Sequence, residues 1–183
     1  MKEVFKFFKE VLKIVILSLI IVVPIRCFVF QPFIVKGISM EPNFHNGDYL
    51  IVDELTYHFR DPVRGEVIVF RYPQNPSQRF IKRVIGLPGE KVILKNGKIE
   101  IVDRFGKKKV LDESAYLSRE NWLTQKTFVL KEDEYFVLGD NREHSFDSRR
   151  WGPLPKKYII GRVVFRAWPP DSVKAFFKPL YNY

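Results

Sequence analysis

A lysine in apolar surroundings is the first residue of this sequence suited to chemistry. Lys82 lies in the stretch Arg79–Glu90 (RFIKRVIGLPGE), where strand alternation puts Phe80, Lys82 and Val84 on one face. Burial beside apolar neighbours disfavours the charged ammonium and lowers the pKa of the lysine. A decrease from ~10.4 to ~8.4 corresponds to roughly 2.7 kcal/mol, which desolvation can supply. A neutral amine of this kind could act as a general base. The other interpretation is a lysine that extends to the surface, and the sequence alone favours it.

Ser39, in the stretch Gly37–Pro42 (GISMEP), is the matching candidate nucleophile. A serine could also be activated by a histidine, and the chain has three: His45, His58 and His144. The G-x-S-x-G pattern of a nucleophile elbow is absent, because position 41 is Glu. Each histidine lies among turn or loop residues, which favours surface or structural roles. Lys82 is therefore the better candidate base.

A third polar stretch, Leu138–Pro153 (LGDNREHSFDSRRWGP), follows an apolar segment. Its Gly-Asp-Asn start is typical of a turn. Acidic and basic side chains gather around Ser145: Asp140, Arg142, Asp147, Arg149 and Arg150. Taken alone, this composition favours a loop tied by Asp–Arg pairs. The density of polar side chains directly after an apolar strand also suggests a functional site.

One long apolar segment, Val11–Phe30 (VLKIVILSLIIVVPIRCFVF), must position the serine, which follows Phe30 by nine residues. Its twenty residues would measure roughly 30 Å as a helix, enough for one bilayer crossing. The uninterrupted part, Ile14–Ile25, is shorter, so cations at both ends would have to reach the headgroups. A buried core helix and a cleaved signal peptide are the alternatives, and the second lacks a small-residue cleavage pattern. We expect a retained anchor.

Charge predicts how this anchor is oriented. Lysines dominate its N-terminal flank: Lys2, Lys6, Lys9 and Lys13. The other flank carries Arg26 and Lys36, so the positive-inside rule puts residues 1–10 in the cytoplasm and residues from about 31 onward outside. The formal charge of +10 then argues for anionic lipid as a partner and against nucleic acid, which lies in the other compartment. Cys27 is the only cysteine, so the exported domain has no disulfide.

Beyond residue 30 the apolar period changes to two, which predicts strands. The expected strands are 33–35, 49–52, 66–72, 79–85, 92–94, 98–102, 135–138 and 159–168. Asn96-Gly97, between VILK and KIEI, predicts a tight hairpin. We therefore expect a mainly antiparallel β domain over residues 31–183. The charged region from about Asp103 to Lys131 lacks the pattern and predicts a small inserted subdomain, about residues 92–132.

Four motifs, in order behind the apolar segment, closely resemble bacterial type I signal peptidase (leader peptidase), a family of membrane-bound serine–lysine endopeptidases. They are GISMEP, RGEVIVF, FIKRVIGLPGEKV and GDNREHSFDSRRWG. The resemblance extends from about Ile25 to Trp168. It implies a β-rich catalytic core related to LexA-type peptidase domains, with a short inserted cap and one N-terminal transmembrane helix.

The resemblance also implies roles for individual residues. Ser39 is expected to be the nucleophile and Lys82 the general base, with Ser145 hydrogen-bonded to the lysine amine. An Asp147–Arg149 pair would hold the loop in place. The serine motif is completed by Met40 and Pro42. No metal or organic cofactor is expected.

One departure from the family concerns the oxyanion. Many relatives carry a serine two residues before the nucleophile, and its hydroxyl helps to bind the oxyanion; this chain has Gly37. The backbone N–H of Ser39 can still donate. Either the backbone near Gly37 or a water would have to replace the missing donor, whose loss can cost about 2.7 to 4 kcal/mol.

The activity implied by the resemblance is removal of N-terminal signal peptides from translocated preproteins, through an acyl-enzyme intermediate, at the plasma membrane. The expected partners are preprotein signal peptides, an anionic phospholipid membrane and the secretion translocon. Aromatic residues near the C-terminus would either contact the membrane interface or pack in the core: Trp168, Phe176, Phe177, Tyr181 and Tyr183. Two other functions stay open. One is a specialised processing peptidase of the same family, and the other is a non-catalytic, membrane-anchored β domain that binds envelope polymers.

Overall fold

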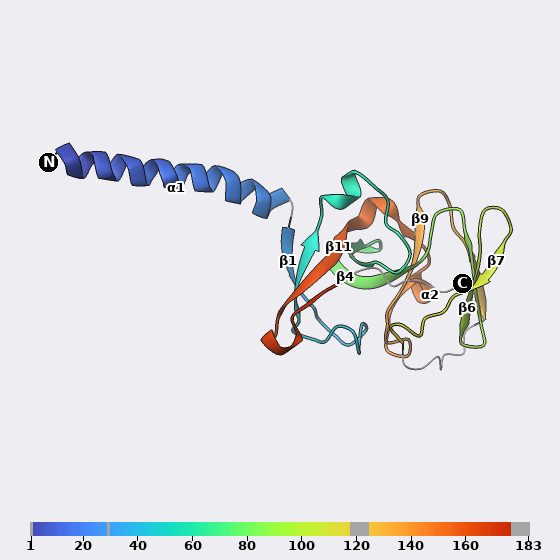
Figure 1. The fold of residues 1–183 in the computed structure, drawn as a ribbon. Helices are drawn as coiled ribbons and strands as arrows, with labels where there is room; N and C mark the ends of the chain where they lie inside the picture. Colours follow the sequence, from blue (N-terminus) through green and yellow to red (C-terminus); the bar gives the residue numbers. More distant parts are fainter. Residues whose placement is uncertain (1, 29, 118–124, 177–183) are drawn as a thin grey trace.

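A long N-terminal helix projects from a β-sheet body in the computed structural model (Figure 1). The structure describes residues 2–28, 30–117 and 125–176, without the side chains of residues 2, 3, 5 and 21–30. Helix α1 (Lys2–Phe28) carries exposed apolar side chains such as Phe8 and Ile14. Within the described residues, no helix combines the length and apolar content that a bilayer crossing needs. Val29 and the side chains of residues 21–30, part of the expected anchor, lie outside this description, and the anchor stays a prediction.

The main sheet is antiparallel throughout, as the period-two pattern predicts. Its strands follow the order β1-β2-β11-β3-β4-β9-β10, and β12 pairs with β11. They are β1 (Phe30–Ile34), β2 (Tyr49–Asp53), β3 (Val67–Tyr72), β4 (Asn75–Gly86), β9 (Glu134–Leu138), β10 (Leu154–Pro155), β11 (Ile159–Trp168) and β12 (Lys174–Ala175). β4 starts before the predicted residue 79, because its polar first residues pair with the end of β3 despite lacking apolar alternation.

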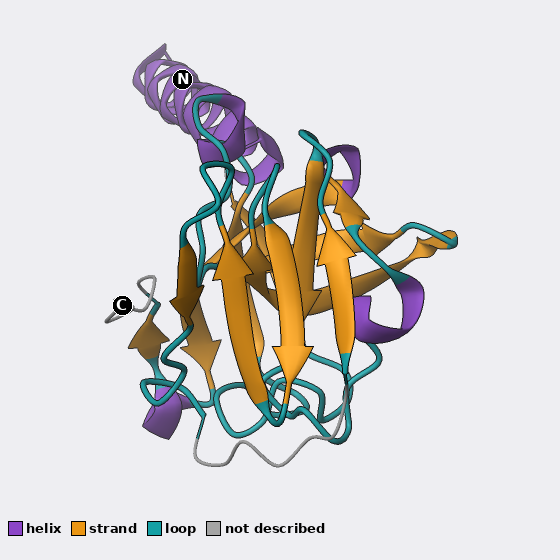
Figure 2. Ribbon diagram, turned by 90° about the vertical axis from the view of Figure 1, so that its right-hand side faces the viewer, coloured by secondary structure: helices purple, strands orange, loops and turns teal. Residues whose placement is uncertain are grey.

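A second, smaller sheet comes from the same part of the chain as the expected insert. Its order is β7-β6-β5-β8, and Figure 2 shows it in front of the main sheet. The strands are β5 (Lys91–Lys95), β6 (Lys98–Val102), β7 (Lys108–Val110) and β8 (Lys126–Val129). The predicted hairpin at Asn96-Gly97 is confirmed, and both turn residues have positive φ, 51° and 77°. β7 and β8 were not predicted, because they are short, lysine-bearing and largely exposed.

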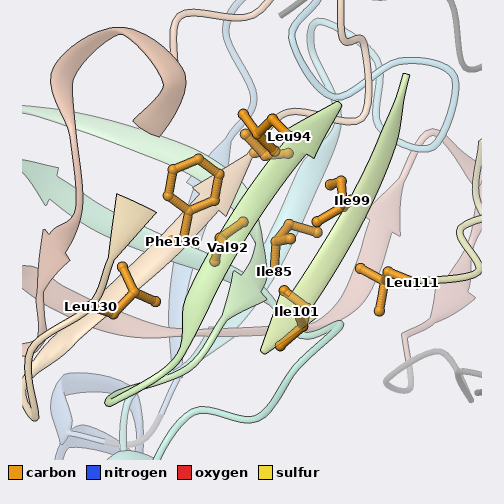
Figure 3. Packing of buried hydrophobic residues seen from close by; sticks show 9 residues of the cluster. Ile85, Val92, Leu94, Ile99, Ile101, Leu111, Leu130 and Phe136 are labelled. Carbon is orange, nitrogen blue, oxygen red and sulfur yellow. The ribbon is translucent and has the colours of Figure 1, made fainter. Parts of the chain in front are cut away.

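Apolar side chains join the two sheets. Figure 3 shows this cluster, in which Ile85 of β4 and Phe136 of β9 contact residues of the second sheet. Its members are Ile85, Val92, Leu94, Ile99, Ile101, Leu111, Leu130, Phe136 and Leu138. Two further clusters form around the main sheet, and one of them contains Met40, directly after the candidate serine. The loop that carries Ser39 is thus fixed to the core by its own neighbour.

Short helical turns complete the fold. They are α2 (Ser148–Trp151) and the 3₁₀ turns Thr56–His58, Lys156–Tyr158 and Pro170–Ser172. Of the C-terminal aromatics, Phe176 packs 4.5 Å from Phe44, centroid to centroid, whereas Trp168 is mostly exposed. Phe177, Tyr181 and Tyr183 lie outside the described residues.

Candidate active site

The serine and the lysine selected from the sequence meet in the structure. Lys82 lies within β4, and Ser39 lies in the turn-rich segment that follows β1. Lys82 Nζ is 2.7 Å from Ser39 Oγ and donates a second hydrogen bond of 2.8 Å to the Ile81 carbonyl. Both groups are therefore placed for proton transfer, which requires a separation of about 2.6–3.2 Å.

Lys82 is buried, which decides between the two interpretations of its side chain. Its side chain shares a face with Phe80, whose ring centroid lies 5.6 Å from Nζ, and only 4% of the residue is exposed. Desolvation lowers the pKa of Lys82 to about 8, although the carboxylates of Asp147 and Asp140 act in the opposite direction. A substantial fraction of the amine is thus neutral at mildly alkaline pH.

The pair opens onto a hollow of about 500 Å³. One wall is formed by the segment around Ile34 and Ile38, and the other by β4 near Phe80. Both isoleucines are about half exposed, at 54% and 46%. The hollow therefore offers apolar walls to an extended segment whose backbone passes Ser39.

Ser145 is close to the pair but does not make the expected contact. It is 5% exposed, and its Oγ has no hydrogen-bond partner among the described residues. The expected Ser145–Lys82 hydrogen bond is therefore wrong for this structure, in which the amine donates to Ser39 and to the Ile81 carbonyl. Ser145 Oγ packs tightly against Gly139, beside the backbone oxygen of Ser39.

The expected Asp147–Arg149 pair is present. Arg149 Nε and Nη2 each lie 2.8 Å from a carboxylate oxygen of Asp147. Asp147 also caps α2 and accepts a 3.1 Å hydrogen bond from the backbone N–H of Gly139. Arg149 donates to the carbonyl oxygen of Arg142 at 2.7 Å. The pair therefore ties both ends of the polar loop together.

Two buried ion pairs support the same loop and were not predicted. Arg83 donates to both oxygens of Asp140, at 2.8 and 2.5 Å, and Arg142 donates to both oxygens of Glu113, at 2.9 and 2.5 Å. Asn43 Nδ2 donates to Asp140 at 2.9 Å, which links the serine segment to this network. The acidic and basic residues were visible in the sequence, but their partners lie 57 and 29 positions away.

Replacing Asp140 with Ala is expected to destabilise the protein by about 3–5 kcal/mol, because a buried guanidinium loses its carboxylate partner. The Asp140 side chain is fully buried and that of Arg83 is 6% exposed. Urea unfolding would measure the change. Asp61→Ala is the matched control: it removes an aspartate from an exposed pair with Lys156 and should cost less than about 1 kcal/mol. Equal losses in the two variants would contradict the prediction.

The segment before Ser39 shows how the missing serine hydroxyl is accommodated. Gly37 has a φ of +90°, which disfavours a residue with a side chain, and its N–H donates to Asn46 Oδ1 at 2.9 Å. Within the described chain, the backbone N–H of Ser39 has no acceptor in range. Met40 is buried in the core and Pro42 is exposed. Of the two backbone N–H groups, that of Gly37 is already bonded, and that of Ser39 is not bonded within the described chain.

The three histidines are exposed, in line with surface roles. His144 borders the hollow, and the His58 ring contacts the carbonyl oxygen of Glu54. The group that contacts Ser39 Oγ is the Lys82 amine.

Comparisons with known proteins identify the family of this chain. A family model described as "Signal peptidase, peptidase S26" matches residues 8–168. Signal peptidase I of Leptolyngbya laminosa is 40% identical over 173 residues, which cover 90% of this chain and 81% of that protein. Signal peptidase IB of Staphylococcus aureus (strain COL) is 31% identical over 186 residues, covering 93% and 96%. A solved structure of a signal peptidase I from Enterococcus faecalis V583 is 34% identical, with a TM-score of 0.46, and covers 56% of this chain and 97% of that one. The chain therefore belongs to the signal peptidase family of serine proteases, peptidase S26.

Proposed function

We propose that this protein is a membrane-anchored endopeptidase that removes signal peptides from translocated preproteins, with Ser39 as nucleophile and Lys82 as general base. The observation that carries the proposal is the 2.7 Å contact between Ser39 Oγ and the buried Lys82 amine. A non-catalytic envelope-binding domain would gain nothing from a buried amine at this position, since burial of a lysine costs stability.

The mechanism follows from the two contacts of Lys82. In the neutral amine, one N–H donates to the Ile81 carbonyl, and the nitrogen lone pair accepts the Ser39 hydroxyl proton. Ser39 Oγ attacks the scissile carbonyl, and its proton passes to Lys82. The C–N bond then breaks as the lysine returns this proton to the leaving amine. Water, deprotonated by the same amine, hydrolyses the resulting ester and frees Ser39.

Position explains why such a site would act on preproteins. Nine residues separate Phe30 from Ser39, and nine extended residues span at most ~32 Å. With α1 as a single-pass anchor and its N-terminal lysines in the cytoplasm, Ser39 stays near the outer membrane face. A preprotein held by its own apolar segment presents its cleavage site there. Small side chains of an extended substrate would fit the hollow beside Ser39, and anionic lipids and the translocon are the proposed neighbours.

The proposal is tested by cleavage of a model preprotein with the full chain in lipid vesicles. Ser39→Ala should abolish cleavage, because no other oxygen is placed as nucleophile in the proposed mechanism. A variant with His45, His58 and His144 all replaced by Ala should keep activity within about threefold, since an exposed histidine has no part in the proton transfer. Loss of activity in the histidine variant alone would restore a histidine triad.

Cleavage is also expected to accelerate as pH rises through about 8. The neutral form of Lys82 is the active one, and burial lowers the pKa of Lys82 to about 8. Below that pH, kcat/KM should rise about tenfold per pH unit, and above it the profile should level off. Initial rates between about pH 6 and 10, with a substrate that does not titrate in that range, would show this. A midpoint near 6.5, the ordinary pKa of histidine, would contradict it.

A further inference from the structure

Asn141, which the proposed mechanism does not use, bonds to the backbone on both sides of Ser39. Its side-chain Nδ2 donates to the carbonyl oxygen of Ile38 at 3.2 Å. Its own backbone N–H donates to the carbonyl oxygen of Ser39 at 3.1 Å. A single residue of the polar loop thus contacts both peptide groups that flank the candidate nucleophile.

The first of these bonds helps to set the direction of the Ser39 N–H. The cis peptide bonds of the described chain precede Pro42 and Pro169, so the Ile38–Ser39 peptide is trans. In a trans peptide the carbonyl and the N–H lie in one plane and point in opposite directions. Holding the Ile38 oxygen therefore fixes the direction of the Ser39 N–H.

The turn itself also holds this peptide, because the backbone N–H of Glu41 donates to the same Ile38 oxygen at 3.2 Å and Met40 is buried in the core. Side chains of the residues before Ser39 add little restraint. Gly37 is exposed and has no side chain, and Ile38 is 46% exposed. Asn141, in contrast, stands between two residues held in buried ion pairs, Asp140 with Arg83 and Arg142 with Glu113. A firmly held loop thus adds a second donor, from outside the turn, to the Ile38 oxygen.

The orientation of the Asn141 amide is set from its other side. Its Oδ1 accepts a hydrogen bond from the backbone N–H of His144 at 3.3 Å, which leaves Nδ2 to face Ile38. The side chain can satisfy both contacts only with its oxygen toward His144 and its nitrogen toward Ile38.

We propose that Asn141 is a positioning residue for the oxyanion. Its side-chain amide holds the Ile38–Ser39 peptide so that the Ser39 N–H donates to the substrate oxygen that becomes negative when Ser39 Oγ attacks. This inference rests on the proposed peptidase function and deepens it. Gly37 supplies no hydroxyl, and its N–H bonds to Asn46. Stabilisation of the oxyanion therefore depends more strongly on the direction of the Ser39 N–H.

The test compares Asn141→Ala with Asn141→Asp in the full chain in lipid vesicles. Asp keeps the acceptor for His144 but cannot donate to Ile38, so both variants lose the proposed function of the side chain. We expect kcat, read on the high-pH plateau, to fall about 10- to 100-fold in both, less than the roughly 10²–10³-fold expected for complete loss of an oxyanion donor. KM should change by less than about twofold, and the Ala variant should keep its pH midpoint near 8.

A peptide aldehyde inhibitor gives an independent measurement. Ser39 Oγ adds to the aldehyde carbon of the inhibitor. The aldehyde oxygen becomes a hemiacetal oxyanion at the position that the substrate oxyanion would occupy. Its affinity should fall by the same factor as kcat in both variants. Asn96→Asp is the matched control, because it makes the same chemical change at an exposed hairpin turn and should leave kcat, KM and inhibitor affinity unchanged.

Several results would overturn the inference. For Asn141→Ala, one such result is a lower melting temperature with unchanged kcat per titrated serine. A second is a higher KM with unchanged kcat. A third is a shifted pH midpoint with an unchanged kcat on the high-pH plateau. If that variant does not fold, Asn141→Asp, which has nearly the parent shape, decides the question. A parent protein that does not cleave preproteins, or that cleaves them without Ser39, would refute the peptidase proposal itself. Cleavage by the parent together with full activity of the Asn141 variants would refute only the positioning role.

Discussion

A Lys82→Met variant is expected to lose cleavage activity by at least about 10³-fold and yet to be more stable than the parent protein at pH 7. The loss follows because methionine has no basic nitrogen to accept the Ser39 proton. The gain follows because Lys82 is buried and its pKa is lowered from 10.5 to about 8. Such a shift costs the folded state roughly 3 kcal/mol when the lysine is charged.

The sign of the stability change depends on pH. Between about pH 8 and 10.5 the unfolded chain binds more protons at Lys82 than the folded chain, so the parent gains stability as pH rises through this window. The advantage of Met is therefore complete below pH 8 and disappears above 10.5. Lost hydrogen bonds to Ser39 and Ile81 offset about 1–2 kcal/mol of it, which leaves a net gain of about 1–2 kcal/mol at pH 7. Urea unfolding at pH 7 and pH 10 would measure both values.

Two further variants sharpen this test. Lys98→Met makes the same change at an exposed lysine of β6, and it should alter neither activity nor stability by a measurable amount. Lys82→Arg keeps the charge but cannot become neutral, so it should be inactive and less stable than the parent. Appreciable turnover by Lys82→Met would exclude the lysine as the base. Loss of activity with reduced stability would instead show that the charged amine supports the fold.

The strand that carries this lysine could be predicted from sequence because it depends on a local pattern, whereas the pattern alone favours an exposed amine. Alternation along β4 places Lys82 and Phe80 on one face, and the last six residues of β4 are buried on both faces. The antiparallel strands and the Asn96-Gly97 hairpin follow from the same kind of short-range information. The 2.7 Å contact with Ser39, 43 positions earlier in the chain, does not, and it was expected only through the resemblance to a family.

Features that depend on distant partners were missed or wrong for a physical reason. Glu113 lies in a region without apolar alternation, so nothing local indicated that it would be buried against Arg142. Ser145 was expected to bond the lysine amine, but its Oγ has no hydrogen-bond partner among the described residues, and the amine donates to Ser39 and to the Ile81 carbonyl. The sequence also gave no reason to assign a steric role to Gly139 at the end of β9. Such contacts depend on the relative placement of strands, which periodicity does not determine.

The second large effect is expected for Gly139→Ala, which should inactivate the site by moving the backbone of Ser39. A Cβ at position 139 would lie 2.4 Å from the Ser39 carbonyl oxygen and 2.2 Å from Ser145 Oγ. The Ser145 hydroxyl can rotate, but Ser145 Cβ would still lie 2.6 Å from the new Cβ, and the Ser39 backbone oxygen cannot move without carrying Ser39 away from Lys82. A displacement of about 1 Å can cost about 10²-fold in rate, and overpacking typically costs about 1–3 kcal/mol of stability. We expect both losses, measured as kcat/KM per titrated serine and by urea unfolding.

Gly161→Ala separates the two effects of this substitution. A Cβ at position 161 would lie 2.5 Å from the carbonyl oxygen of Asp53, where β11 pairs with β2, so the steric conflict with a backbone oxygen is of the same kind. This conflict moves two strands and not the Ser39 segment. Gly161→Ala should therefore lose a similar amount of stability while its kcat/KM per titrated serine stays within about twofold of the parent. If both variants lost turnover equally, general loosening of the sheet, and not the placement of Ser39, would limit activity.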